Sequence, residues 1–150
     1  MRAINHALTG AVIGVMVSVP EVAIPMALVS HFALDTVPHF GIDRQKDITR
    51  SWFQKLLILD AFLCVTLVAI IVTVRPKGWL LIAVCAFVAA MPDFMLIPRF
   101  YRAKRYGNTS STTHYALMRF HDDLQTEKPA GAVLELLWLP AMVLLLVVLG

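Results

Sequence analysis

The stretch SHFALDTVPHF, residues 30–40, decides how this chain is interpreted. It places two imidazoles and a carboxylate, those of His31, Asp35 and His39, four residues apart at the end of an otherwise apolar segment. His31 and Asp35 stand at positions i and i+4, so they share one face of a helix and can hold one metal ion between them. Ionisable groups in a membrane segment are costly unless they have partners, so we expect these residues to be functional.

The rest of the chain is also apolar. Of its 150 residues, 59% are hydrophobic and only 15% are charged, whereas about 25% are charged in a typical soluble domain. This composition predicts a single all-α integral membrane domain, residues 1–150. Cys64 and Cys85 form no CxxC pair, so we interpret them as small apolar residues and not as a disulfide or a thiolate metal site. The net charge of +3 comes from loops beside apolar segments, so we expect no nucleic-acid binding.

Apolar runs predict about five membrane segments. A spanning helix needs about 20 residues, so the last three runs are long enough and the first two are short helices or a hairpin that enters and returns. Pro20 and Pro25 mark the turn between the first two segments and the start of the second helix. We expect the basic N-terminus to be retained, because no convincing signal-peptide cleavage site follows it. The segments cover residues 6–19, 22–37, 56–74, 79–97 and 130–149.

The distribution of positive charge predicts the orientation of these segments. If all five cross, eleven of the 13 Lys and Arg residues lie on one side, and only Arg75 and Lys77 lie on the other. Positive residues collect on the cytoplasmic side, so we expect a multi-pass protein of the inner (plasma) membrane with a cytoplasmic N-terminus and an outer C-terminus. Between the fourth and fifth segments, apolar residues from Tyr115 to Leu124 predict a cytoplasmic interfacial helix carrying His114 and His121.

With this orientation, the ionisable residues of all five segments lie toward the cytoplasmic side. No Lys or Arg lies inside the spans to neutralise the carboxylates, and a bound divalent cation would do so. A mixture of imidazoles and carboxylates favours zinc, with manganese or iron as alternatives, over calcium or magnesium. The predicted metal ligands are His6, His31, Asp35, His39, Asp93 and His121, and the predicted catalytic carboxylates are Glu135 and Asp60.

The number of ions stays open at one or two. His31 and His39 would lie about 12 Å apart along an ideal helix, so His39 serves a second ion or supports the first, unless Pro38 bends the chain back. Simpler roles also exist for the other acids. Asp93 follows Pro92 and could cap a helical half, Asp60 could hydrogen-bond a neighbouring helix, and Glu135 could lie at the membrane interface.

Two motifs resemble a known family. Asn5-His6-Ala7-Leu8-Thr9-Gly10, followed by the motif from His31 to His39, is similar to the YdjM-like group of small bacterial and archaeal membrane proteins. Members of that group are described as inner-membrane-associated, metal-dependent hydrolases. His6 and Gly10 match the first motif, and Asp35 with His39 matches the second. The chain lacks the later Arg/Thr/His motif that many members carry. The resemblance implies hydrolysis of lipids or other phosphoesters at a membrane surface.

Three functional hypotheses follow. The first is a membrane-embedded metal-dependent hydrolase, in which the metal activates a water molecule and Glu135 or Asp60 acts as general base on a lipid or other (phospho)ester. The second is a non-enzymatic ion-binding protein such as a small transporter or transport subunit. The nearly apolar outer halves of the segments argue against a path across the membrane. The third is a structural module in which the metal only clamps helices.

Overall fold

The protein is an all-helical bundle over the part of the chain that the computed structural model describes, residues 1–40, 51–95, 120–121 and 123–150. No strand occurs among these residues, and His39 and Glu127 form an isolated β-bridge. The predicted all-α class is therefore confirmed. The elements are α1 (Ala3–Met16), α2 (Pro20–Asp35), α4 (Ser51–Val74), α5 (Trp79–Ala90), the 3₁₀ turn η1 (Met91–Met95) and α8 (Gly131–Leu149).

Each predicted apolar segment overlaps one of these helices, and the fourth segment differs most from its prediction. A helix was expected to reach residue 97, but α5 ends at Ala90 and passes into η1. Pro92 explains this change, because it lacks the N–H group that would continue the helix. Pro20 occupies the first turn of α2, as predicted. Of the predicted interfacial helix, residues 120, 121, 123 and 124 are helical. His114 lies outside the described residues.

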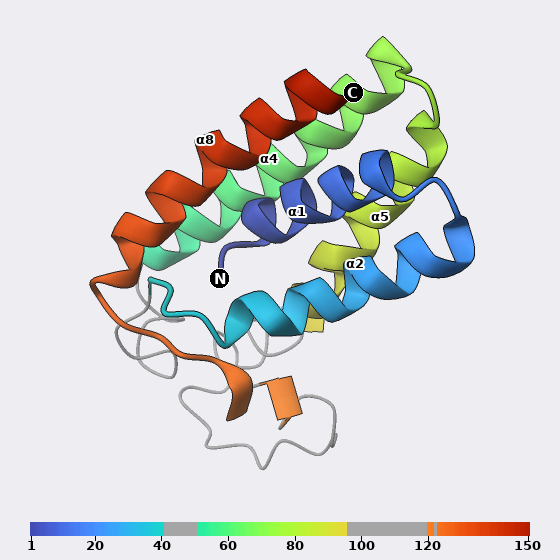
Figure 1. The fold of residues 1–150 in the computed structure, drawn as a ribbon. Coiled ribbons are helices and arrows are strands. Elements are labelled where there is room, and N and C mark those ends of the chain that lie inside the picture. The colour runs from blue at the N-terminus through green and yellow to red at the C-terminus, as the bar shows by residue number, and fades with distance from the viewer. Residues whose placement is uncertain (41–50, 96–119, 122) are drawn as a thin grey trace.

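Helix α1 is the centre of the bundle. It contacts α2, α4, α5 and α8, and Figure 1 shows it between α2 and α8. Successive segments reverse direction, so the start of α1, the end of α2, the end of α5 and the start of α8 come together. The amino group of Met1 contacts Asp35, and the ring of His31 contacts the carbonyl of Ala89. This end of the bundle carries the polar side chains described below.

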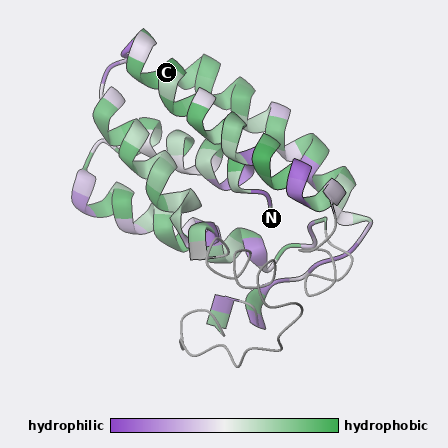
Figure 2. Cartoon of the chain, turned by 180° about the vertical axis from the view of Figure 1, so that it is seen from behind, coloured by the Kyte–Doolittle hydropathy of each residue, from purple (hydrophilic) through white to green (hydrophobic). Residues whose placement is uncertain are grey.

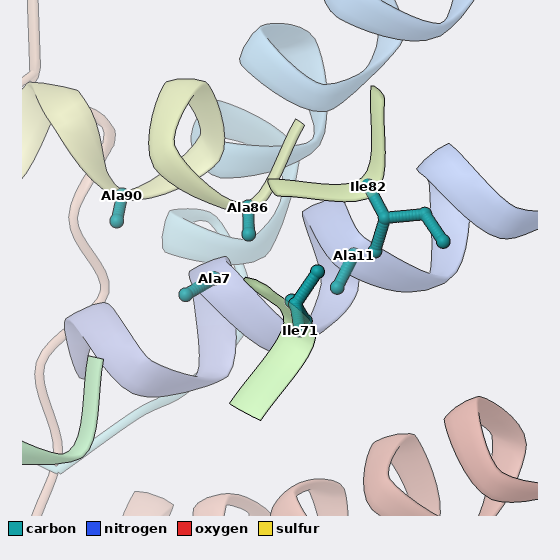
Figure 3. Packing of buried hydrophobic residues seen from close by; sticks show 6 residues of the cluster. All are labelled: Ala7, Ala11, Ile71, Ile82, Ala86 and Ala90. Carbon is teal, nitrogen blue, oxygen red and sulfur yellow. The ribbon is translucent and has the colours of Figure 1, made fainter. Parts of the chain in front are cut away.

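Small residues allow α1 and α5 to approach closely. A Cβ atom at Gly10 would collide with the carbonyl group of Cys85, and one at Gly14 would lie 2.8 Å from the Cα atom of Ile82. Alanines from both helices continue this contact, and Ile71 of α4 packs against them (Figure 3). Gly10 and Gly14 form a GxxxG pattern, which is typical of closely packed helices, and this contact fixes the position of α1 against α5.

Two helices expose apolar surface along most of their length. α4 and α8 are long and apolar enough to cross a membrane. Phe62 is 64% exposed on α4, and Leu136 is 75% exposed on α8. Hydrophobic colouring dominates the helices in Figure 2. Large contiguous apolar surfaces are unusual on soluble monomers and are typical of surfaces that meet lipid or a partner.

Candidate metal centre

A buried polar cluster lies where α2 ends. Asp35, the last residue of α2, is fully buried together with His31 one turn earlier. His6 comes from the second turn of α1, and His121 comes from the helical residues that precede α8 in the chain. His6 and His31 are both 0% exposed, and His121 is 3% exposed. Side chains from three distant parts of the sequence therefore meet in one buried place.

Three donor atoms form a compact triangle in this cluster. The Nε2 atoms of His31 and His121 are 3.0 Å apart. Asp35 Oδ2 lies 3.2 Å from the first of these nitrogens and 3.1 Å from the second. Ligands at about 2.0–2.1 Å from a tetrahedral zinc ion are about 3.3–3.4 Å from one another. The triangle is close to that size, so these residues fit a small divalent cation.

The contact of His31 with the backbone determines which of its ring nitrogens carries the proton. The Nδ1 atom of His31 lies 2.8 Å from the carbonyl oxygen of Ala89, and a carbonyl oxygen only accepts hydrogen bonds. The proton of a neutral ring is therefore on Nδ1, and Nε2 carries a lone pair. This lone pair faces a carboxylate oxygen and a second imidazole nitrogen. A cation at this point would be within reach of both nitrogens and the carboxylate oxygen, and a backbone carbonyl is a common orienting partner for a metal-binding histidine.

The amino group of Met1 and three imidazole rings surround the carboxylate of Asp35. The amino group of Met1 donates to Oδ1, and His6 Nε2 lies 3.2 Å from the same oxygen. His31 and His121 face Oδ2. A buried carboxylate is stable only when opposite charge or hydrogen-bond donors compensate it. Asp35 is thus the central acid of the cluster, and its two oxygens face different sets of partners.

His6 and Asp93 form a second grouping with His31. One ligand atom of each lies within 4.8 Å of the other two. Both ring nitrogens of His6 and Asp93 Oδ2 are buried without a hydrogen bond to any described residue. The rings of His6 and His31 lie 4.0 Å apart between centroids. Asp93 Oδ1 is 3.9 Å from His121 Nε2. These atoms are therefore available as further ligands.

Gln125 also reaches the cluster, although the sequence analysis did not select it. Its Nε2 atom lies 3.1 Å from His121 Nε2 and 3.4 Å from Asp35 Oδ2. The only sequence signal was its spacing, because Gln125 follows His121 by four residues just as Asp35 follows His31. Glutamine is a rare ligand for zinc, so residue type gave no reason to select it.

The two predicted catalytic carboxylates bind the start of α1. Asp60 accepts hydrogen bonds from the backbone N–H groups of Ala3, at 2.8 Å, and Ile4, at 3.0 Å. Glu135 accepts one from the N–H of Arg2 at 3.0 Å and also forms an ion pair with the side chain of Arg2. α1 has no side-chain cap of its own at Arg2. Acids from α4 and α8 therefore satisfy N–H groups that the first turn of a helix leaves unpaired.

His39 belongs to neither of the two metal groupings found among the described residues. The chain leaves the helix after Asp35, and His39 forms backbone hydrogen bonds with Thr126 and Lys128. Its Nδ1 atom contacts the carbonyl of Val37 at 2.9 Å. The start of α8 covers this point, since a Cβ atom at Gly131 would collide with the backbone of His39. Its contacts therefore connect the end of α2 to the segment before α8.

Comparison with known proteins gave no match for this chain among protein families, curated proteins or solved structures.

Proposed function

We propose that this chain is a membrane-embedded, metal-dependent hydrolase of the YdjM-like type, acting on a lipid or other (phospho)ester at the cytoplasmic interface of the inner membrane. The observation that carries the proposal is the triangle of His31, Asp35 and His121. Its three ligand atoms lie 3.0–3.2 Å from one another, and the backbone contact of His31 leaves no proton on Nε2 of the neutral ring. A single divalent cation, preferably zinc, satisfies all three groups.

Different residues of the chain would bind the metal and act as the general base. His31, Asp35 and His121 hold the cation, and His6 and Asp93 complete one or two coordination shells. A cation of this kind polarises an ester and lowers the pKa of a water molecule. Asp60 and Glu135 remain the candidate general bases. Their contacts with the start of α1 support an additional role, because they orient the helix that carries His6.

The exposed helices support the membrane part of the proposal. α4 and α8 would present their apolar surfaces to lipid, and the helix ends beside the cluster would lie at the cytoplasmic interface. An ester bond of a lipid headgroup lies at that depth. A metal centre there would reach its substrate without extracting it from the bilayer.

Metal analysis of the protein purified in mild detergent tests the proposal directly. We expect about one equivalent or more of a transition metal. The loaded protein should release p-nitrophenol from bis-p-nitrophenyl phosphate or cleave a phospholipid in mixed micelles. Purified protein that holds no transition metal and acquires none from zinc-containing buffer would overturn the proposal.

A structural metal clamp is the second candidate. The observation that favours it is the burial of His6, His31 and Asp35, each 0% exposed, between separate segments of the bundle. A clamp would bind the metal and raise the unfolding temperature without hydrolysing any ester. The same loaded protein therefore separates the two candidates when stability and hydrolysis are measured together.

A further inference from the structure

Gln125 takes a position in the cluster that its residue type does not explain. Its amide Nε2 atom lies 3.1 Å from His121 Nε2 and 3.4 Å from Asp35 Oδ2. The same nitrogen lies 3.3 Å from His121 Nδ1, so the amide lies beside the His121 ring and against two of the three atoms of the triangle. A tetrahedral site needs a fourth ligand beside these atoms. Gln125 therefore borders the fourth corner of the site.

The amide group can present either of its two ends to that corner. The oxygen and nitrogen of a carboxamide have nearly the same shape, and the hydrogen-bond network decides which one faces a given partner. Gln125 Oε1 is buried without a hydrogen bond to any described residue, so no such partner holds it away from the cluster. A cation between His31, Asp35 and His121 would favour the oxygen, because an amide nitrogen offers only donors.

We infer that Gln125, through Oε1, is the fourth ligand of the metal centre and that a water molecule or an anionic oxygen or nitrogen ligand displaces it. This inference rests on the proposed function, because it requires a cation at the triangle. It deepens that function by assigning the corner at which a substrate reaches the metal. A neutral amide is a weaker ligand than a carboxylate or an imidazole for a zinc-like ion, so Gln125 is the ligand that leaves most easily.

Burial supports the same assignment. Asp35 and His31 are 0% exposed and His121 is 3% exposed, whereas Gln125 is only partly buried. The Nδ1 atom of His31 is held by the Ala89 carbonyl. Gln125 follows the last helical residue before α8, Leu124, and has a long side chain that can turn away. Gln125 is therefore more exposed than His31, Asp35 and His121.

A fourth ligand that can be displaced combines features of structural and catalytic zinc sites. A structural site is closed by four protein ligands, and a catalytic site keeps one position for water or substrate. Gln125 would close the site at rest and open it when a ligand arrives. A centre of this kind binds its metal tightly and still accepts an anionic ligand, such as a phosphoester oxygen.

The test uses the full chain loaded with Co²⁺, whose visible absorption reports the ligands around it. Gln125→Ala removes the proposed ligand, and Gln125→Glu replaces it with a stronger, charged one. Gln54→Ala is the matched control, because Gln54 lies in the first turn of α4 and belongs to neither metal grouping. Sodium azide serves as the anionic probe. Co²⁺ affinity and azide affinity are measured for each variant.

We expect Gln125→Ala to weaken Co²⁺ binding about 10-fold and to change the visible spectrum. The same variant should bind azide more tightly than the wild type, because azide no longer competes with the amide. Gln125→Glu should have the opposite effect on both affinities. If both Gln125 variants match Gln54→Ala and the wild type in spectrum and affinities, the inference is wrong and the metal centre stands. A wild-type protein that binds no Co²⁺ would overturn the metal centre and this inference together.

Discussion

The Nε2 atoms of His31 and His121 lie 3.0 Å apart, although 90 residues separate them in the chain. Asp35 Oδ2 lies within 3.2 Å of both. One proton between these two nitrogens makes a hydrogen bond, and it leaves the carboxylate oxygen to find a donor elsewhere. A metal ion in place of that proton would give both nitrogens and Asp35 Oδ2 the same partner.

Removing Asp35 should release the metal. Asp35→Asn keeps the size of the side chain and removes its charge, and His31→Ala removes one nitrogen of the triangle. We expect either change to lower zinc affinity by at least 10-fold, measured by competition with a chromophoric chelator. Asp123→Asn is the control, because Asp123 is exposed close to His121 in the sequence. Wild-type metal content in both cluster variants would show that the centre lies elsewhere.

Metal removal should lower the stability of the bundle. The ligands come from α1, α2 and the segment before α8, so a bound ion links three parts of the chain that unfolding separates. A ligand at 1,000 times its dissociation constant stabilises a folded protein by about 4 kcal/mol. We expect a chelator to lower the unfolding temperature in detergent and added zinc to restore it. In His31→Ala the chelator should have little effect, which separates loss of the ion from unspecific action of the chelator.

Substitution of Asp60 should destabilise α1. Asp60→Ala leaves the N–H groups of Ala3 and Ile4 without the acceptors that they have in the structure. A buried donor without a partner costs about 1–3 kcal/mol, so thermal unfolding should begin at a clearly lower temperature. Asp60→Asn keeps one acceptor oxygen, so its unfolding temperature should lie between those of the wild type and Asp60→Ala. If Asp60→Asn instead abolishes hydrolysis at an unchanged unfolding temperature, Asp60 acts as the general base and not mainly as a cap.

Enlarging Gly10 should disturb both packing and the metal centre. A side chain at Gly10 meets the backbone of Cys85 and the Cβ atom of Ala89, and the carbonyl of Ala89 holds His31. Overpacking costs about 1–3 kcal/mol, and we expect Gly10→Leu to reach at least that range and to weaken zinc binding as well. Ala61→Leu on the exposed face of α4 adds a larger side chain without such a neighbour. Equal unfolding temperatures for the two variants would contradict the close contact of α1 with α5.

Local sequence patterns were enough to predict the helices and part of the centre. Apolar runs identified each helix, because a segment of that length and composition is stable as a helix once its apolar side chains are covered by other helices or by lipid. The spacing of His31 and Asp35 placed them on one face, and the structure brings their side chains within 3.2 Å. The alternating direction of the segments was also enough to predict that the acids and imidazoles gather at one end of the bundle.

Tertiary structure alone decided which of these residues meet. Asp60 and Glu135 lie at the same end as the cluster, yet they bind the backbone at the start of α1. Gln125 carried no signal in its residue type, and it reaches the cluster because the segment after His121 folds against the end of α2. The physical reason is that spacing along one helix specifies only that helix's own faces. Contacts between helices depend on how closely their backbones approach, and at Gly10 that approach is set by the missing side chain against α5.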